Sequence, residues 1–237
     1  MPFVATRRAL LSRPAAAGGG WWDNDGAIAG CTAAYRAIGA ANIAASQVNL
    51  ANPGTYDLVK YGANPPLWSA GNGWYSFATN GVWTPNGLYI PASETNTVII
   101  RWAPLTGFSA SRDTLYGRGA GQAKDVGNWG VTLNYDFNDT AINGDSRTVG
   151  NALRSGKTFA VNASGVYYNG SLLAWNVSGT LGFSGDAFGI GAMINDADGT
   201  LSYADDLVSI QAFVLYDAVS LSNTDMGTII TAMAALT

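Results

Sequence analysis

The feature that most constrains the fold is a period of two in the apolar residues, which recurs along the chain after residue 21. Between residues 129 and 137, apolar side chains alternate with small or polar ones at Trp129, Val131, Leu133, Tyr135 and Phe137. Successive side chains of a β-strand point to opposite faces, so this alternation predicts a strand with one buried and one wet face. Residues typical of turns separate such segments about every eight to twelve positions, which indicates an all-β protein.

Other segments extend the pattern. Residues 188–194 alternate in the same way, and two glycines in this segment leave room for a close neighbour. Residues 208–216 are apolar at almost every position, which predicts a central strand covered on both faces. The dipeptide Asn169-Gly170 lies between two apolar runs and predicts a tight hairpin, because both residues tolerate a positive φ.

Two segments predict short helices. Residues 42–50 are rich in alanine and would form a turn or two before Asn52-Pro53-Gly54 ends the helix. Ser222 and Asp225 resemble a capping box, and the apolar residues that follow, up to residue 236, have helical spacing. We therefore predict a two-sheet antiparallel jelly-roll sandwich with a short C-terminal helix, in one domain of the 237-residue chain.

Composition excludes several chemistries. The chain has no histidine, one cysteine (Cys31) and one glutamate (Glu94), while the other fifteen of its sixteen acidic residues are aspartates. Histidine-dependent nucleophile systems, imidazole-bound zinc and intramolecular disulfides therefore cannot be built from this sequence. The net charge of −4 argues against a nucleic-acid surface, and no apolar run is long enough to span a membrane.

The first twenty residues differ from the rest. Residues 1–20 contain no acidic group and end in three glycines. We predict that they form an extended basic arm on a glycine hinge, with the sandwich at 21–237. A frayed tail without a role and an organelle transit peptide are the alternatives. The arm residues expected to dock on a partner are Phe3, Arg7, Arg8, Leu10, Leu11 and Arg13.

Several stretches carry a family resemblance. Residues 207–222 followed by a helix, the hairpin at 166–170 and the segment 188–191 resemble the concanavalin A-like lectin/glucanase superfamily, in its laminin-G-like jelly-roll branch. Residues 31–35 and 48–57 resemble uncharacterised laminin-G-like proteins found in tailed-phage structural gene sets. The resemblance covers about residues 28–237, and it implies the fold more specifically than any activity.

The sequence departs from the glucanases of this superfamily at their catalytic motif. Those enzymes use two glutamates as nucleophile and acid/base, held about 5 Å apart. Glu94 has no glutamate partner, and the nearest acidic patterns are Asp196-x-Asp198 and Asp136-x-x-Asp139. We therefore expect no enzymatic activity, and a hydrolase using Asp136 and Asp139 is the weaker alternative.

Two groups of residues are candidate binding sites. Trp68, Trp74, Tyr75 and Trp83 lie in a stretch rich in Gly, Asn and Pro, where exposed rings would stack on sugars. The alternative is that most of them fill the core. Asp196, Asp198 and Asp205 could hold calcium, the one cofactor considered, and the alternative there is a solvated turn.

The resemblance, the missing catalytic groups and the separate arm predict a non-enzymatic structural protein on the virion surface of a tailed phage. It would be a decoration, fibre or tail-surface component, docked on other virion proteins through residues 1–20. We expect a homo-oligomer, with a trimer as one form, because the chain is apolar and poor in charge. The alternative is a lectin-like module that binds host-surface glycans, with or without calcium.

Overall fold

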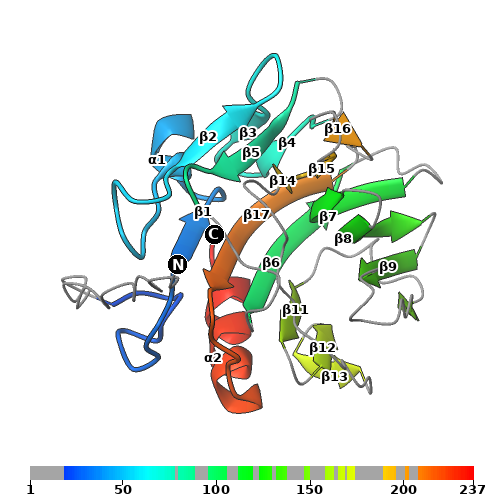
Figure 1. Cartoon of the computed structure of the whole chain (residues 1–237). Helices are drawn as coiled ribbons and strands as arrows, with labels where there is room; N and C mark the ends of the chain where they lie inside the picture. The colour runs from blue at the N-terminus through cyan, green and yellow to red at the C-terminus, as the bar shows by residue number, and fades with distance from the viewer. Residues whose placement is uncertain are drawn as a thin grey trace, which may run out of the picture.

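The computed structural model is a β-sandwich of two mainly antiparallel sheets with two helices (Figure 1), which confirms the predicted fold class. It describes residues 19–77, 80–88, 96–105, 112–119, 123–129, 132–137, 147–149, 158–162, 165–168, 170–173, 189–195, 201–202 and 208–237. The predicted arm at 1–20 lies outside this part of the chain except for its last two glycines.

One sheet, here called sheet A, has eight strands in the order β13-β12-β11-β6-β17-β4-β3, with β1 also paired to β17. Its strands are β1 (Ala33–Arg36), β3 (Leu67–Ser69), β4 (Gly73–Tyr75), β6 (Thr97–Pro104), β11 (Thr158–Asn162), β12 (Gly165–Tyr168), β13 (Ser171–Leu173) and β17 (Val208–Tyr216). The two longest strands, β6 and β17, are neighbours in the middle of the sheet.

The other sheet, sheet B, has nine strands in the order β10-β9-β8-β7-β14-β5-β2, with β15 paired to β7 and β16 paired to β15. Its strands are β2 (Leu58–Tyr61), β5 (Val82–Pro85), β7 (Arg112–Gly119), β8 (Ala123–Trp129), β9 (Thr132–Phe137), β10 (Arg147–Val149), β14 (Gly189–Ile190), β15 (Met193–Asn195) and β16 (Leu201–Ser202). The edge strands β2 and β3 are joined by the short connection 62–66 (Figure 1).

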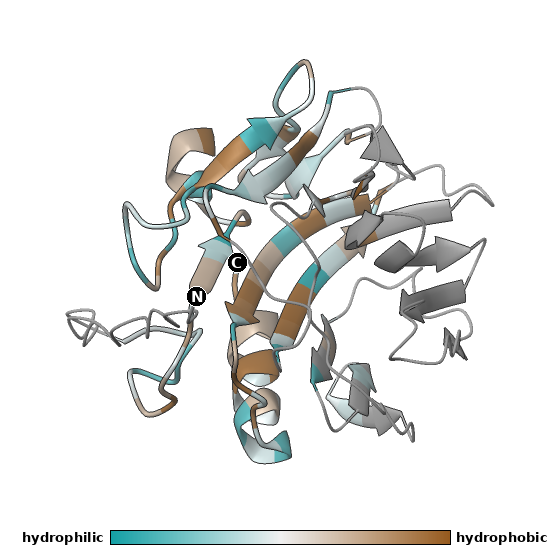
Figure 2. Ribbon diagram, in the orientation of Figure 1, coloured by the Kyte–Doolittle hydropathy of each residue, from teal (hydrophilic) through white to brown (hydrophobic). Residues whose placement is uncertain are grey.

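Strand β17 organises two apolar clusters. All nine of its residues are buried, as the sequence predicts, and apolar residues colour most of β17 and β6 in Figure 2. On the face toward sheet B, Ile210, Phe213 and Leu215 join the inner core. On the opposite face, Val214 and Tyr216 join a second cluster beneath the C-terminal helix. Sheet A is therefore covered on both sides along its centre.

The C-terminal helix α2 (Asn223–Ala234) confirms its prediction from sequence. Ser222 is the N-cap, and its Oγ accepts a hydrogen bond from the Asp225 backbone N–H at 3.1 Å. The buried residues of the helix, Met226, Ile229, Ile230 and Met233, face the second cluster. Neither helix in the described part of the chain is long and apolar enough to cross a membrane.

The predicted helix at 42–50 is also present, as the short α1 (Ile43–Gln47). Asn42 caps it, because its side chain accepts a hydrogen bond from the Ala45 backbone N–H at 2.8 Å. Ser46 on this helix accepts a hydrogen bond from the Trp74 indole, which ties α1 to the inner core.

Two strands differ from the sequence prediction. The predicted single strand 129–137 is wrong, because β8 ends at Trp129, which pairs with Thr132 at the start of the antiparallel β9. The predicted strand 188–194 divides into β14 and β15, because Gly191 has a φ of 102° and bends the chain. The expected close neighbour at this glycine is Phe77, whose ring lies where a Cβ of residue 191 would be.

The hairpin predicted at Asn169-Gly170 is confirmed. Tyr168 of β12 pairs with Ser171 of β13 across the predicted turn, and Gly170 has a φ of 79°. The single cysteine, Cys31, is buried in the second cluster.

Candidate functional site

The tryptophans proposed as sugar-stacking residues lie mainly in the core, which corrects that prediction for two of them. Trp74 is 0% exposed and Trp83 is 1% exposed, and their rings are 6.3 Å apart between the sheets. A ring covered on all sides cannot stack on a sugar. The alternative interpretation, that these side chains fill the sandwich, is therefore the right one for this pair.

The other two members of the set lie at the edge of sheet A. Trp68 is half-buried, and its indole nitrogen donates to the Ala37 carbonyl at 2.8 Å, which fixes the ring against the core. Tyr75 is half-buried and pairs directly with Leu67, which is 47% exposed. This pair forms a small apolar surface on the outer face of the β3–β4 hairpin.

The rest of the outer face of sheet A is largely covered by the chain itself. Helix α2 packs against β6 and β11, and the turn that contains Trp22 reaches the Tyr216 hydroxyl, which donates to the Trp22 carbonyl. At the C-terminal end of the helix, the Arg101 guanidinium donates to the backbone carbonyls of Met233 and Leu236 at 2.8 and 2.7 Å. These contacts leave little of this face for a ligand.

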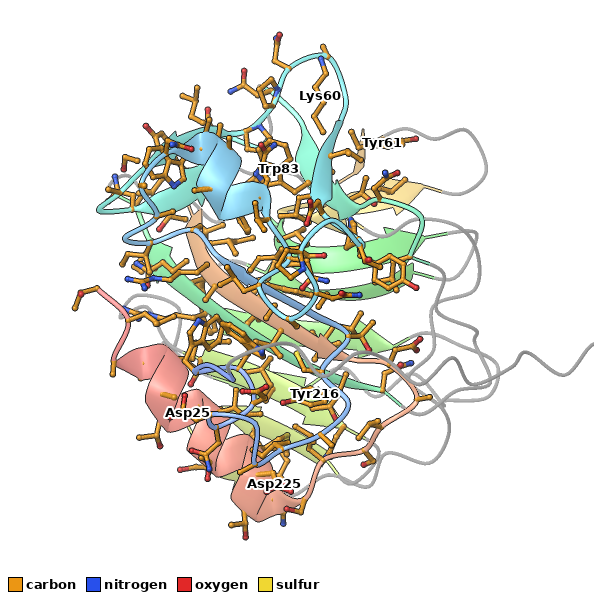
Figure 3. The ribbon with its side chains drawn as sticks, turned by 90° about the vertical axis from the view of Figure 1, so that its left-hand side faces the viewer. Asp25, Lys60, Tyr61, Trp83, Tyr216 and Asp225 are labelled. Carbon is orange, nitrogen blue, oxygen red and sulfur yellow. The ribbon has the colours of Figure 1, made fainter. Side chains whose placement is uncertain are left out.

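The outer face of sheet B differs, because the helix packing of the described residues is on sheet A and its β1 strand (Figure 1). Val59 on β2 is 41% exposed and pairs with Thr84 on β5. Thr84 is buried although it pairs with the exposed Val59, and Val82 and Trp83 before it on β5 both belong to the inner core. Figure 3 shows Lys60 and Tyr61 of β2 at the opposite end of the view from Tyr216 and Asp225.

The register of sheet B continues this row inward from Thr84. Ile190 of β14 pairs with Trp83, so Gly189 lies beside Thr84, and Gly189 in turn pairs with Gly117 of β7. The space beside Gly189 is filled, because the Ala192 carbonyl lies where a Cβ of residue 189 would be and the Ile194 side chain is close to it.

Thr84 is the unusual residue of this row. It is 7% exposed, and within the described structure its Oγ1 has no hydrogen-bond partner. A buried hydroxyl without a partner costs roughly 1–3 kcal/mol. One other threonine shares this property, Thr158 on the outer face of sheet A, where it pairs with Arg101 near helix α2.

The proposed calcium residues Asp196, Asp198 and Asp205, and the arm residues from Phe3 to Arg13, lie outside the described residues. In the part that the structure describes, no group of three acidic or cysteine side chains could hold a metal ion. Of the weaker hydrolase pair, Asp136 lies on β9 and Asp139 is outside the described residues. These predictions remain predictions.

Comparisons with known proteins support the fold. A chain of botulinum neurotoxin type C, which depends on interaction with two ganglioside molecules to enter cells, matches with a TM-score of 0.56 and 11% identity, over 86% of this chain and 51% of that chain. Trypanosoma rangeli sialidase in complex with sialic acid matches with a TM-score of 0.54 and 13% identity, over 87% of this chain and 33% of that chain. Identities this low show a shared β-sandwich fold alone.

A third solved structure is the CBM40 of the Ruminococcus gnavus IT-sialidase, which matches over 62% of this chain and 97% of that chain. The identity is 17% and the TM-score is 0.47, and a likeness this weak carries no argument. No protein-family model matches the sequence, and no curated protein matches it. The chain spans about half of the neurotoxin chain and a third of the sialidase chain.

Sequence reasoning missed Val59 and Leu67 as surface candidates. Both are large apolar residues, for which composition alone indicates the core. Their exposure follows from the places of β2 and β3 at the edges of the two sheets, which the local pattern does not encode.

Proposed function

We propose that this chain is a non-enzymatic carbohydrate-binding protein, and that glycans bind on the outer face of sheet B. Support comes from the fold, which it shares with a toxin that interacts with gangliosides and a sialidase in complex with sialic acid. Sheet A offers less room, because helix α2 and the Trp22 turn cover its outer face.

The observation that carries this proposal is the exposed side chain of Val59 on the edge strand β2, which is 41% exposed on the outer face of sheet B. It gives the apolar contact that the carbon face of a sugar prefers. Lys60 beside it is exposed as well, and its ammonium group can donate to the hydroxyl groups of a sugar. This edge of sheet B thus joins one polar and one apolar contact.

The absence of hydrolysis is part of the same proposal. The sequence contains no histidine and a single glutamate, so it lacks the two catalytic glutamates of the glucanases in the superfamily that it resembles. Reducing-sugar assays on every glycan that binds should therefore show no product above the buffer control. Product release would contradict the non-enzymatic part of the proposal and leave the binding face in place.

The test is a glycan array with the full chain, run with calcium and with a chelator, followed by titration of the best ligand against Val59→Ser. We expect this variant to weaken binding about tenfold, because it removes an apolar contact with the ligand, and to leave the stability of the fold unchanged, because the residue is exposed. Leu67→Ser is the matched control, since it removes a similarly exposed apolar side chain from the edge of the other sheet. Its affinity should equal that of the wild type.

Two results would contradict the proposal. Silence on the array under both conditions would remove the binding function for the sugars tested. Equal affinity of Val59→Ser and the wild type would show that the ligand does not bind on this face.

A second candidate rests on the sequence of residues 1–20, which hold three of the twelve basic residues and no acidic one. We infer from this segregation a basic arm separate from the 21–237 sandwich, and from the laminin-G-like resemblance a structural role on a phage particle as a homo-oligomer at the virion surface. Deleting residues 1–20 should abolish attachment to the particle, and retained attachment would exclude docking through the arm. Both roles can coexist, since an outward sandwich can also adhere to glycans.

A further inference from the structure

Strand β3 is the last strand of sheet A and pairs there with β4 alone. An edge strand carries a row of backbone N–H and C=O groups along its free side, and these can pair with another chain. Natural proteins often protect such edges with charged side chains. Between Lys60 and Glu94 the sequence has no charged residue, so β3 and the whole β3–β4 hairpin lack this protection.

The outer face of this edge is apolar. Trp68 packs against the inner core, so alternation along the strand places Leu67 and Ser69 on the outer face. Leu67 pairs with the half-buried Tyr75 and, at 47%, is the most exposed large apolar side chain of the described residues. A strand added at this edge would therefore cover apolar surface as well as complete a backbone ladder.

The hairpin is held in place, so the edge is preorganised for a partner. The Trp68 indole is hydrogen-bonded to the chain just after β1 at 2.8 Å, and the Ala70 carbonyl accepts from the Gly39 N–H at 2.8 Å. Before the strand, Pro66 has no N–H to offer. The backbone that is open to pairing is therefore Leu67–Ser69, with its centre at Trp68.

We propose that β3 is a dimer interface, where a second copy of this chain adds its own β3 in the antiparallel direction. Two identical strands pair in this way about a two-fold axis, and the same patch then serves both copies. With the axis at Trp68, Leu67 lies opposite Ser69 of the second copy. The two Leu67 side chains are then diagonal neighbours on one face of the joined sheet, about 7–8 Å apart.

The lack of charge favours a second copy over other partners. An uncharged edge meets its own copy without the like-charge repulsion that would arise between two copies of a charged edge, such as β2 with Lys60. Nucleic acid would require basic side chains, and a charged peptide would find no opposite charge on this hairpin. Because a two-fold contact uses each β3 once, association ends at the dimer.

The test is sedimentation velocity of the full chain. Three residues a strand form a small contact, so we expect a monomer that converts to a dimer as the concentration rises from about 5 to about 500 µM. Leu67→Asp and Leu67→Lys should each weaken this association at least about tenfold, because each places two like charges beside the axis. Thr224→Asp is the matched control, since it adds the same charge to an exposed residue of α2, and it should dimerise like the wild type.

An equal mixture of Leu67→Asp and Leu67→Lys should dimerise again, because opposite charges then meet across the axis. This recovery separates a lost contact from a misfolded variant, since two misfolded chains would not restore each other. Thermal unfolding of each variant alone should resemble that of the wild type, because Leu67 is exposed in the single chain.

A wild type that stays monomeric at the highest concentration, or that assembles beyond the dimer, would overturn the proposal. So would association of Leu67→Asp with the affinity of the wild type, or a mixture of the two charged variants that stays monomeric. These results do not depend on glycan binding, which titration measures for each site, so this inference and the proposed function can fail separately.

Discussion

At the scale of single residues, Asn49 holds the connection between β1 and β2. Its side chain is fully buried and makes four hydrogen bonds to the backbone. Oδ1 accepts from the N–H groups of Ala34 and Ala51 at 3.0 and 3.1 Å, and Nδ2 donates to the carbonyls of Thr32 and Thr55 at 3.0 and 2.8 Å. These four bonds use the full capacity of a primary amide.

Replacing Asn49 by Asp should therefore destabilise the protein by about 3 kcal/mol, because a carboxylate cannot donate to the two carbonyls and would be buried beside them. Urea unfolding followed by tryptophan fluorescence measures the change. Thr55→Ala is the control, since this exposed residue contributes only its backbone carbonyl to the network. Equal stabilities of the Asp variant and the wild type would show that the network carries no stability.

Tyr216 is a second residue with a measurable consequence. Burial, followed by the nearby acidic groups Cys31, Asp23 and Asp225, raises the pKa of its hydroxyl well above the ordinary value of about 10. Below about pH 10 the hydroxyl is neutral in both the folded and the unfolded chain, so its contribution is fully present. As the pH rises further, only the unfolded chain ionises, and stability falls.

We expect the free energy of unfolding to decline above about pH 10, by at most about 1.4 kcal/mol per pH unit from this group. Tyr216→Phe should be less stable at neutral pH, because it loses the bond to the Trp22 carbonyl, and should have a shallower alkaline decline. Burial also raises the pKa of the Tyr35 hydroxyl, so part of the alkaline decline in stability should remain in both proteins. Parallel pH curves for the variant and the wild type would contradict this assignment.

The tryptophans show what sequence can and cannot give at this scale. Composition indicated that most of them belong in the core, and Trp74 and Trp83 do. Which ones stay near the surface depends on pairing across strands, as for Tyr75 opposite Leu67. That pairing joins residues on different strands, and the local pattern does not encode it.

At the scale of elements, the sequence predicted those whose signals are local. The cap at Ser222, the apolar stripe of α2 and the Asn169-Gly170 turn each depend on neighbouring residues. The prediction of one strand over residues 129–137 was wrong because the alternation of apolar and polar residues continues past Trp129, where β8 ends. A period of two shows that strands are present, and it does not show where a short turn divides them.

Helix α2 allows a test at this scale. Ser222→Ala removes the acceptor for the Asp225 backbone N–H and should cost about 1 kcal/mol, while Ser222→Asn should retain most of the stability. Ser220→Ala serves as control, because this exposed neighbour lies outside the cap. Thermal unfolding monitored by circular dichroism gives the comparison. A loss of the same size at both serines would assign the effect to the connecting segment instead of the cap.

At the scale of the whole molecule, the two sheets have different outer surfaces. Sheet A is closed by α2 and the Trp22 turn, whereas sheet B presents the exposed Val59 at its edge. The sequence predicted the sandwich and the C-terminal helix, since both follow from periodicity. It could not place Val59 at an exposed edge, because that depends on the order of strands from distant parts of the chain.

The boundary between arm and sandwich gives the last prediction. The described chain enters the fold at Gly20, whose carbonyl accepts from the Asp23 and Asp25 N–H groups, and Trp21 and Trp22 pack on the second cluster. Deleting residues 1–18 should therefore leave the unfolding temperature within about 2 °C of the full chain. Deleting residues 1–28 should lower it by more than about 6 °C, because Trp21, Trp22 and Ile28 are lost from that cluster.

Circular dichroism melts of the three chains at equal concentration make this comparison, and both deletions should keep the β signal at low temperature. A large loss from the shorter deletion would mean that residues 1–18 contribute to the sandwich, and the boundary at residue 20 would be wrong. With the boundary in place, the shorter deletion separates the two proposed roles. It should leave glycan binding on sheet B unchanged, whereas attachment through the arm requires the residues that it removes.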